Sequence, residues 1–146
     1  MAEFSRHVEV KWAGGLMDGK GTAHAGTGAF ALPVTFPVRI GEPAGHTSPE
    51  ELIAAAHAAC YAMALNATLG RKGAKAAKTH VTATVTADKG DAGIRIVRSH
   101  LKVTVSGLEG MTAEQFAETA KAAEGGCPVS NALRNNLAIT VEPSVV

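Results

Sequence analysis

The sequence has little of what marks several common functional classes. Cysteine occurs only twice in 146 residues, which is too few for the disulfide framework of a secreted domain or for a thiolate metal site. Aromatic residues make up 4% of the chain and the net charge is +1, so neither base-stacking surfaces nor a basic surface for nucleic acid is expected. The six histidines show no metal-ligand spacing, and we predict no metal site.

Signals for secretion and membrane insertion are weak. The opening residues, MAEFSRHVEV, contain no apolar run of the kind found in secretory signals, which favours the cytoplasm, where a disulfide is usually transient and catalytic. Residues 52–69 carry no formal charge and approach the length of a membrane span. Because this stretch is rich in alanine and contains His57, Asn66 and Thr68, we predict a soluble helix that is buried on nearly all faces, partly by a second subunit.

The first third of the chain predicts a strand meander. Residues 8–12 alternate weakly and a glycine-rich turn follows, so two or three short strands are expected before Val38. Pro33 and Pro37 limit the last of these strands to an edge or irregular position.

A long helix is predicted next. Ser48 is a favourable N-cap, Pro49 suits the first helical position, and Glu51 completes a capping box. The helix is expected to run to about Leu69 and to stop at Gly70.

The remaining sequence predicts a hairpin, two helices and a final strand. The expected elements are strands at 79–87 and 94–105, helices at 112–125 and from residue 128, and a strand at 137–141. Thr112 and Gln115 form a second capping box. This order indicates an α+β fold with an antiparallel sheet, in one domain over residues 1–146.

The two cysteines occupy different local settings. Cys60 lies within the long apolar helix, where the helix dipole has little effect and a lone cysteine is usually a small core residue. Cys127 directly precedes Pro128 at a helix start, where unpaired amides and the dipole favour a thiolate. Local physics therefore favours Cys127 as the more reactive thiol, and Cys60 would need a cation such as Arg39. Together the two cysteines indicate a dithiol redox pair.

His57 is the other candidate for chemistry near these cysteines. It lies three residues before Cys60 and one turn before Tyr61, so it could act as a base. The usual behaviour of lone histidines favours a different interpretation, a histidine that is hydrogen-bonded near the helix surface.

Two blocks of the sequence resemble the OsmC/Ohr peroxiredoxins. They are TSPEELIAAAHAACYAMAL and, downstream, GGCPVSNAL, with an arginine ahead of the long helix. The resemblance covers essentially the whole chain, including VKWAGGLMDGKGT, and is closer to the OsmC branch, the osmotically inducible proteins. It implies an OsmC-like fold, in which an antiparallel sheet, a long buried central helix and a second helix form an intertwined homodimer.

The resemblance also implies an activity and roles for four residues. It implies a thiol-dependent peroxidase that acts on organic hydroperoxides and more weakly on hydrogen peroxide. Cys60 matches the peroxidatic cysteine, Cys127 the resolving cysteine, Arg39 the active-site arginine and Glu50 the glutamate that orients it. This order of attack reverses the one that local physics favours. The family needs no flavin, haem or metal, and an external dithiol, a dihydrolipoyl group or a small-molecule thiol, reduces the disulfide.

Two questions remain open at the level of the sequence. A non-catalytic redox-sensing or ligand-binding module could use the same cysteine pair as a switch. Glu50 and Cys60 lie ten residues apart on one predicted helix, roughly 15 Å along its axis. If both serve one site, either Arg39 bridges much of this distance or the glutamate comes from another chain, which favours a homodimer.

Overall fold

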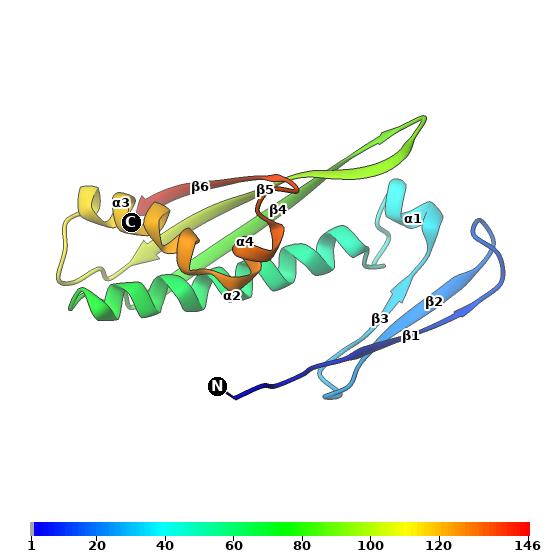
Figure 1. Ribbon diagram of the computed structural model, residues 1–146, viewed down its shortest axis with the longest axis horizontal. Coiled ribbons are helices and arrows are strands. Elements are labelled where there is room, and N and C mark those ends of the chain that lie inside the picture. The colour runs from blue at the N-terminus through cyan, green and yellow to red at the C-terminus, as the bar shows by residue number, and fades with distance from the viewer. Residues whose placement is uncertain (1) are drawn as a thin grey trace. The chain divides into compact units, whose positions relative to one another are not determined.

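Within residues 2–146, which a computed structural model describes, the strands form two sheets of three strands each (Figure 1). The chain divides into two units between Pro49 and Glu50, and each unit is described on its own. The expectation of a single domain over residues 1–146 stays a prediction.

The first unit contains an antiparallel meander. Its strands are β1 (Val8–Ala13), β2 (Lys20–Ala25) and β3 (Ala31–Val34), in the order β1-β2-β3. Trp12 pairs with Gly21 across the first two strands. A Cβ atom at Gly21 would lie 2.7 Å from the Trp12 ring, so glycine leaves the space that the indole occupies. The predicted meander is confirmed.

A short helix, α1 (Phe36–Ile40), follows β3. The prediction of an edge strand that continues towards Val38 is therefore wrong beyond Val34. The Thr35 hydroxyl accepts a hydrogen bond from the Val38 N–H at 3.4 Å, and Pro37 lies in the first helical turn. Threonine as N-cap and proline directly inside the helix are a favourable helix start, which outweighs the weak strand pattern.

The second unit combines helices with a mixed sheet. Its elements are α2 (Pro49–Arg71), β4 (Lys78–Gly90), β5 (Gly93–Ser106), α3 (Ala113–Ala123), the 3-10 turn η1 (Glu124–Gly126), α4 (Pro128–Leu133) and β6 (Ala138–Val145). The hairpin between β4 and β5 is confirmed, with a bulge between Thr86 and Ala87. The capping box is confirmed too, because Gln115 N–H donates to the Thr112 hydroxyl and Thr112 N–H to the Gln115 side chain.

The last strand departs from the predicted antiparallel sheet. β6 pairs with β5 in parallel, from Arg98 opposite Ala138 to Val105 opposite Val145. Between these strands the chain passes through α3 and α4, and such a crossover returns it to the same end of the sheet. The other strand pairs are antiparallel, as predicted.

The core of the second unit lies between α2, α3 and the sheet. The buried positions of α2 recur every fourth residue, at His57, Tyr61, Leu65 and Leu69. They pack with side chains of β5 and α3 in one cluster, which includes Leu101, Val103, Val105, Phe116 and Ala120. The Tyr61 hydroxyl donates to the Ala120 carbonyl at 2.6 Å.

Among the described residues 2–146, the buried side chains of α2 lie on one face of the helix. Met63 on another face is 69% exposed, so the predicted burial on nearly all faces requires cover from outside this chain. By length and composition alone, α2 would also be apolar enough to cross a membrane. Its buried face belongs to the core of the second unit.

Candidate active site

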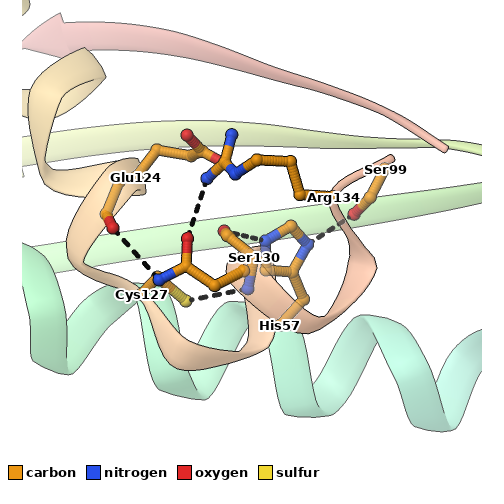
Figure 2. A network of polar contacts seen from close by, with 8 residues as sticks. His57, Ser99, Glu124, Cys127, Ser130 and Arg134 are labelled. Carbon is orange, nitrogen blue, oxygen red and sulfur yellow. Dashed lines mark hydrogen bonds and ion pairs between the residues drawn. The ribbon is translucent and has the colours of Figure 1, made fainter. Parts of the chain in front are cut away.

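Cys127 is the N-cap of α4, as the sequence predicted. Its Sγ accepts a hydrogen bond from the Ser130 backbone N–H at 3.5 Å (Figure 2). Its own backbone N–H donates to the Glu124 carbonyl at 3.1 Å. The residue is fully buried. An accepting side chain at the N-cap satisfies one of the amides that a helix start leaves unpaired.

Cys60 lies beside Cys127, although 67 positions separate them in the sequence. Cys60 is half-buried on α2 and packs against the core cluster that contains Cys127. The Cys127 thiol is close enough to raise the pKa of Cys60. Both cysteines are free thiols in this structure. The fold of the second unit therefore brings the two predicted thiols together, as a dithiol pair requires.

The surroundings of Cys60 within the second unit oppose its ionisation. Burial has the largest effect and raises the pKa of the Cys60 thiol, and Cys127 raises it further. The Val129 backbone N–H lowers this pKa but does not offset the other two effects. A reactive Cys60 thiolate therefore needs a positive charge beyond what this unit places next to it.

The first turn of α4 directs one backbone N–H towards each of the two sulfur atoms. The Val129 N–H faces the Cys60 thiol, and the next amide, that of Ser130, donates to the Cys127 Sγ. Two consecutive backbone donors thus serve two neighbouring sulfurs. The position of this turn determines how the two thiols face each other.

His57 is fully buried next to this turn. Its Nδ1 lies 2.7 Å from the Ser99 hydroxyl on β5, and its Nε2 lies 2.7 Å from the Ser130 hydroxyl on α4 (Figure 2). The predicted hydrogen-bonded histidine is confirmed, but its place near the helix surface is wrong. Burial lowers the pKa of His57, and the Glu124 carboxylate opposes this effect. Both ring nitrogens contact serine hydroxyls and not a cysteine, so these contacts do not support the alternative role of His57 as a base towards Cys60.

Hydrogen bonds and an ion pair also connect residues within the segment 124–134, which contains Cys127. Arg134 forms an ion pair with Glu124 at 2.8 Å and donates to the Asn131 side chain at 3.1 Å (Figure 2). Asn131 in turn donates to the Gly125 carbonyl at 3.2 Å. Sequence reasoning assigned no role at the site to these partners, nor to Ser99 or Ser130. The available signal was the GGCPVSNAL block, which contains Gly125, Ser130 and Asn131.

Arg39 and Glu50 belong to different units of the chain. Arg39 belongs to the first unit, in the last turn of α1, where it lines a pocket of about 180 Å³ with Trp12 and Phe36. Glu50 lies in the first turn of α2, about 15 Å along the helix axis from Cys60. Their roles towards Cys60 stay predictions.

Metal ligation has no support at this site. Among the described residues 2–146, no group of three or more histidine, cysteine, aspartate or glutamate side chains is placed to hold a metal ion.

The fold is α+β, and it places two thiols next to each other, Cys60 within α2 and Cys127 at the start of α4. A family model described as OsmC-like protein matches residues 41–142, and the chain belongs to the OsmC family. Over 134 residues it is 40% identical to the peroxiredoxin OsmC of Escherichia coli (strain K12), which covers 90% of this chain and 91% of that protein.

Other comparisons also give proteins of the OsmC and Ohr type. The organic hydroperoxide resistance protein OhrA of Bacillus subtilis (strain 168) is 36% identical over 98 residues, 66% of each chain. A crystal structure of an organic hydroperoxide resistance protein OsmC from Legionella pneumophila superposes with a TM-score of 0.73 and 25% identity, over 99% of this chain and 98% of that one. The predicted family and the α+β fold are confirmed.

Proposed function

We propose that this protein is a thiol-dependent peroxidase that reduces organic hydroperoxides and, more weakly, hydrogen peroxide. The observation that carries this proposal is the pairing of Cys60 with Cys127 at the first turn of α4, in a chain of the OsmC family. The names of its relatives, peroxiredoxin and organic hydroperoxide resistance protein, agree with this activity.

The chemistry requires three steps. The Cys60 thiolate attacks the terminal oxygen of the hydroperoxide, the O–O bond breaks, the alkoxide takes up a proton and leaves as an alcohol, and Cys60 becomes a sulfenic acid. The Cys127 thiolate then attacks the Cys60 sulfur, an S–S bond forms, and the sulfenic oxygen leaves as water. An external dithiol supplies two electrons, reduces this disulfide and is itself oxidised to a disulfide.

Arg39 and Glu50 complete the proposed site. Burial and Cys127 raise the pKa of Cys60, and a guanidinium is a fixed positive charge that can favour the thiolate. The same group can stabilise the negative charge that develops on the leaving oxygen of the peroxide. Glu50 orients the arginine in this scheme.

A homodimer is part of the same proposal. Apolar side chains remain exposed on the single chain, among them Met63 of α2 at 69% and Val10 of β1 at 57%. Contact with a second copy would cover such surfaces, and a symmetric pair is the commonest oligomer. A partner chain would also allow Glu50 to act at a thiol other than the Cys60 of its own helix.

The proposed partners are few. The substrate is a hydroperoxide and the reductant a dithiol, with a dihydrolipoyl group or a small-molecule thiol as the candidates. We expect the protein to act in the cytoplasm, where thiols are kept reduced, without nucleic acid, a membrane or a bound cofactor.

Continuous turnover tests this function. With dihydrolipoamide as the reductant, the protein should consume cumene or tert-butyl hydroperoxide over many cycles, and hydrogen peroxide more slowly. A redox sensor would be oxidised once and then stop, so a single equivalent of peroxide consumed in the presence of excess reductant would contradict the peroxidase.

A further inference from the structure

A buried chain of hydrogen bonds joins three elements of the second unit behind the thiols. His57 on α2 contacts Ser99 on β5 through Nδ1 and Ser130 on α4 through Nε2, each at 2.7 Å (Figure 2). All three side chains are fully buried. A neutral imidazole donates from one nitrogen and accepts at the other, so it complements two hydroxyl groups. The proposed peroxidase chemistry uses none of these three side chains.

Ser130 connects this chain of hydrogen bonds to the sulfur atoms. Its side chain contacts His57, while its backbone N–H donates to the Cys127 Sγ at 3.5 Å. The preceding amide, that of Val129, faces the Cys60 thiol. His57 therefore contacts the residue, Ser130, whose own amide donates to one sulfur and whose preceding amide faces the other.

We propose that His57 is a positioning residue, which through the Ser130 hydroxyl fixes the first turn of α4 so that the Cys127 sulfur is held against Cys60. This inference rests on the proposed peroxidase function. His57 touches neither substrate nor a reacting atom in this role. Its effect is on the geometry with which Cys127 attacks the Cys60 sulfenic acid, forms the S–S bond and releases water.

The two cysteines should depend on His57 to different degrees. Cys60 is part of the 23-residue helix α2, whose buried face belongs to the core. Cys127 precedes the six-residue helix α4, which is held to α2 and β5 through the Ser130–His57–Ser99 contacts. Loosening this anchor should therefore slow disulfide formation more than the first oxidation of Cys60.

Two substitutions of His57 each keep one of its two hydrogen bonds and remove the other. A glutamine amide reaches the place of Nε2 and can keep the Ser130 contact, whereas an asparagine amide reaches only the place of Nδ1 and keeps the Ser99 contact. His57→Asn and Ser130→Ala should both slow disulfide formation about tenfold, the effect expected for the loss of one buried hydrogen bond. His57→Gln should stay within about threefold of the wild type by the same reasoning.

Rapid quenching measures the two steps separately. Reduced protein is mixed with cumene hydroperoxide, stopped with an alkylating agent and dimedone, and analysed by mass spectrometry for thiol, sulfenic acid, disulfide and sulfinic acid. In His57→Asn and Ser130→Ala, the loss of free Cys60 thiol should change little. The disulfide should appear late, and more sulfinic acid should accumulate, because the sulfenic acid survives longer.

His100→Asn is the matched control. His100 also has both ring nitrogens engaged, with Thr140 at 2.6 Å and Glu142 at 3.0 Å, but these contacts are exposed. This variant should behave as the wild type in both steps. Should His57→Asn fail to fold, Ser130→Ala tests the same anchor from its other end.

Three results would overturn the proposal. The first is disulfide formation at the wild-type rate in Ser130→Ala. The second is an equal loss in both steps in His57→Asn and Ser130→Ala, which would mean that His57 supports the fold alone. The third is equal behaviour of His57→Gln and His57→Asn, which would remove the Ser130 contact as the cause.

A peroxide-free measurement keeps this test independent of the proposed function. Equilibration with reduced and oxidised glutathione reports how readily Cys60 and Cys127 form their disulfide. His57→Asn and Ser130→Ala should lower this equilibrium constant relative to His57→Gln, and unchanged constants would contradict the positioning role. A wild type that forms the disulfide with glutathione but does not consume hydroperoxide would instead contradict the peroxidase.

Discussion

The two cysteines reach one site from backbone segments of very different kinds. Cys60 lies in the middle of α2, a helix of 23 residues with a face in the core. Cys127 stands at the start of α4, a helix of six residues held by side-chain contacts. Burial raises the pKa of the Cys60 thiol.

This difference agrees with a division of roles. A thiol on a rigid helix keeps a fixed position towards the substrate and the activating charge, as an attacking residue requires. A thiol on a short helix with its own anchor can be held next to the first sulfur, in position to attack it after it has been oxidised. We therefore expect that position in the fold, more than the local helix dipole, decides which cysteine attacks first.

Removal of the attacking thiol should have the largest effect. Cys60→Ser should abolish hydroperoxide consumption, because no other thiol in this scheme reacts with peroxide. Steady-state assays with cumene hydroperoxide and dihydrolipoamide measure this loss. Cys127→Ser is the matched variant, and it should still react with one equivalent before sulfinic acid accumulates. Retained turnover in Cys60→Ser would break the comparison between the two thiols.

Arg39 tests how the buried thiol is activated. Arg39→Ala should lower the rate of the first oxidation at neutral pH by about 10²–10³-fold, as expected for the loss of one charge-stabilising donor. Burial and Cys127 already raise the pKa of Cys60. Loss of the Arg39 charge should therefore shift to higher pH the range in which the oxidation rate of Cys60 increases.

A pH profile of Cys60 oxidation checks the role of Arg39. Arg39→Lys keeps the charge but loses the planar pair of donors, so it should restore the pH profile more than the rate. A profile for Arg39→Ala that matches the wild type would show that another group activates Cys60.

The exposed face of α2 tests the proposed dimer. Met63 is 69% exposed on the single chain, and Met63→Glu would place a charge where we expect contact with a second copy. We predict that sedimentation shows a shift from dimer to monomer at micromolar concentration, while Met63→Leu stays dimeric. An active wild-type monomer at low concentration would contradict the dimer.

The smallest expected effect concerns the pH dependence of stability. Burial lowers the pKa of His57 in the folded state, so the folded protein binds fewer protons than the unfolded chain below the unfolded value of about 6.5. The free energy of unfolding should therefore fall as the pH drops through this range. Urea titrations between neutral and mildly acidic pH should show a smaller decline for His57→Gln than for the wild type. Equal declines would mean that His57 does not contribute to the acid sensitivity.

Local signals predicted much of the fold. The Thr112–Gln115 capping box, the N-cap at Cys127 and the long helix from Pro49 are each encoded within a few residues. The parallel pairing of β6 was missed because it depends on the path of α3 and α4 between two strands. The helix α1 was missed because Pro37 was interpreted as a limit to a strand and not as part of a helix start.

The site was predictable only in part. The two cysteine blocks identified the thiols, since both blocks are continuous in the sequence. The Ser99–His57–Ser130 contacts join β5, α2 and α4, over separations of 42 and 73 positions. No local pattern encodes such contacts, because they exist only after the sheet and the helices have packed.

The order in which the two sulfurs react can be measured directly. Reduced Cys127→Ser and Cys60→Ser are each mixed with one equivalent of cumene hydroperoxide, and peptide mass spectrometry locates the added oxygen. We predict rapid conversion of Cys60 to a sulfenic acid in Cys127→Ser, with Cys127 still reduced in Cys60→Ser. Rapid oxidation of Cys127 in Cys60→Ser, with an inert Cys60 in Cys127→Ser, would contradict these roles and show that the helix start selects the attacking thiol.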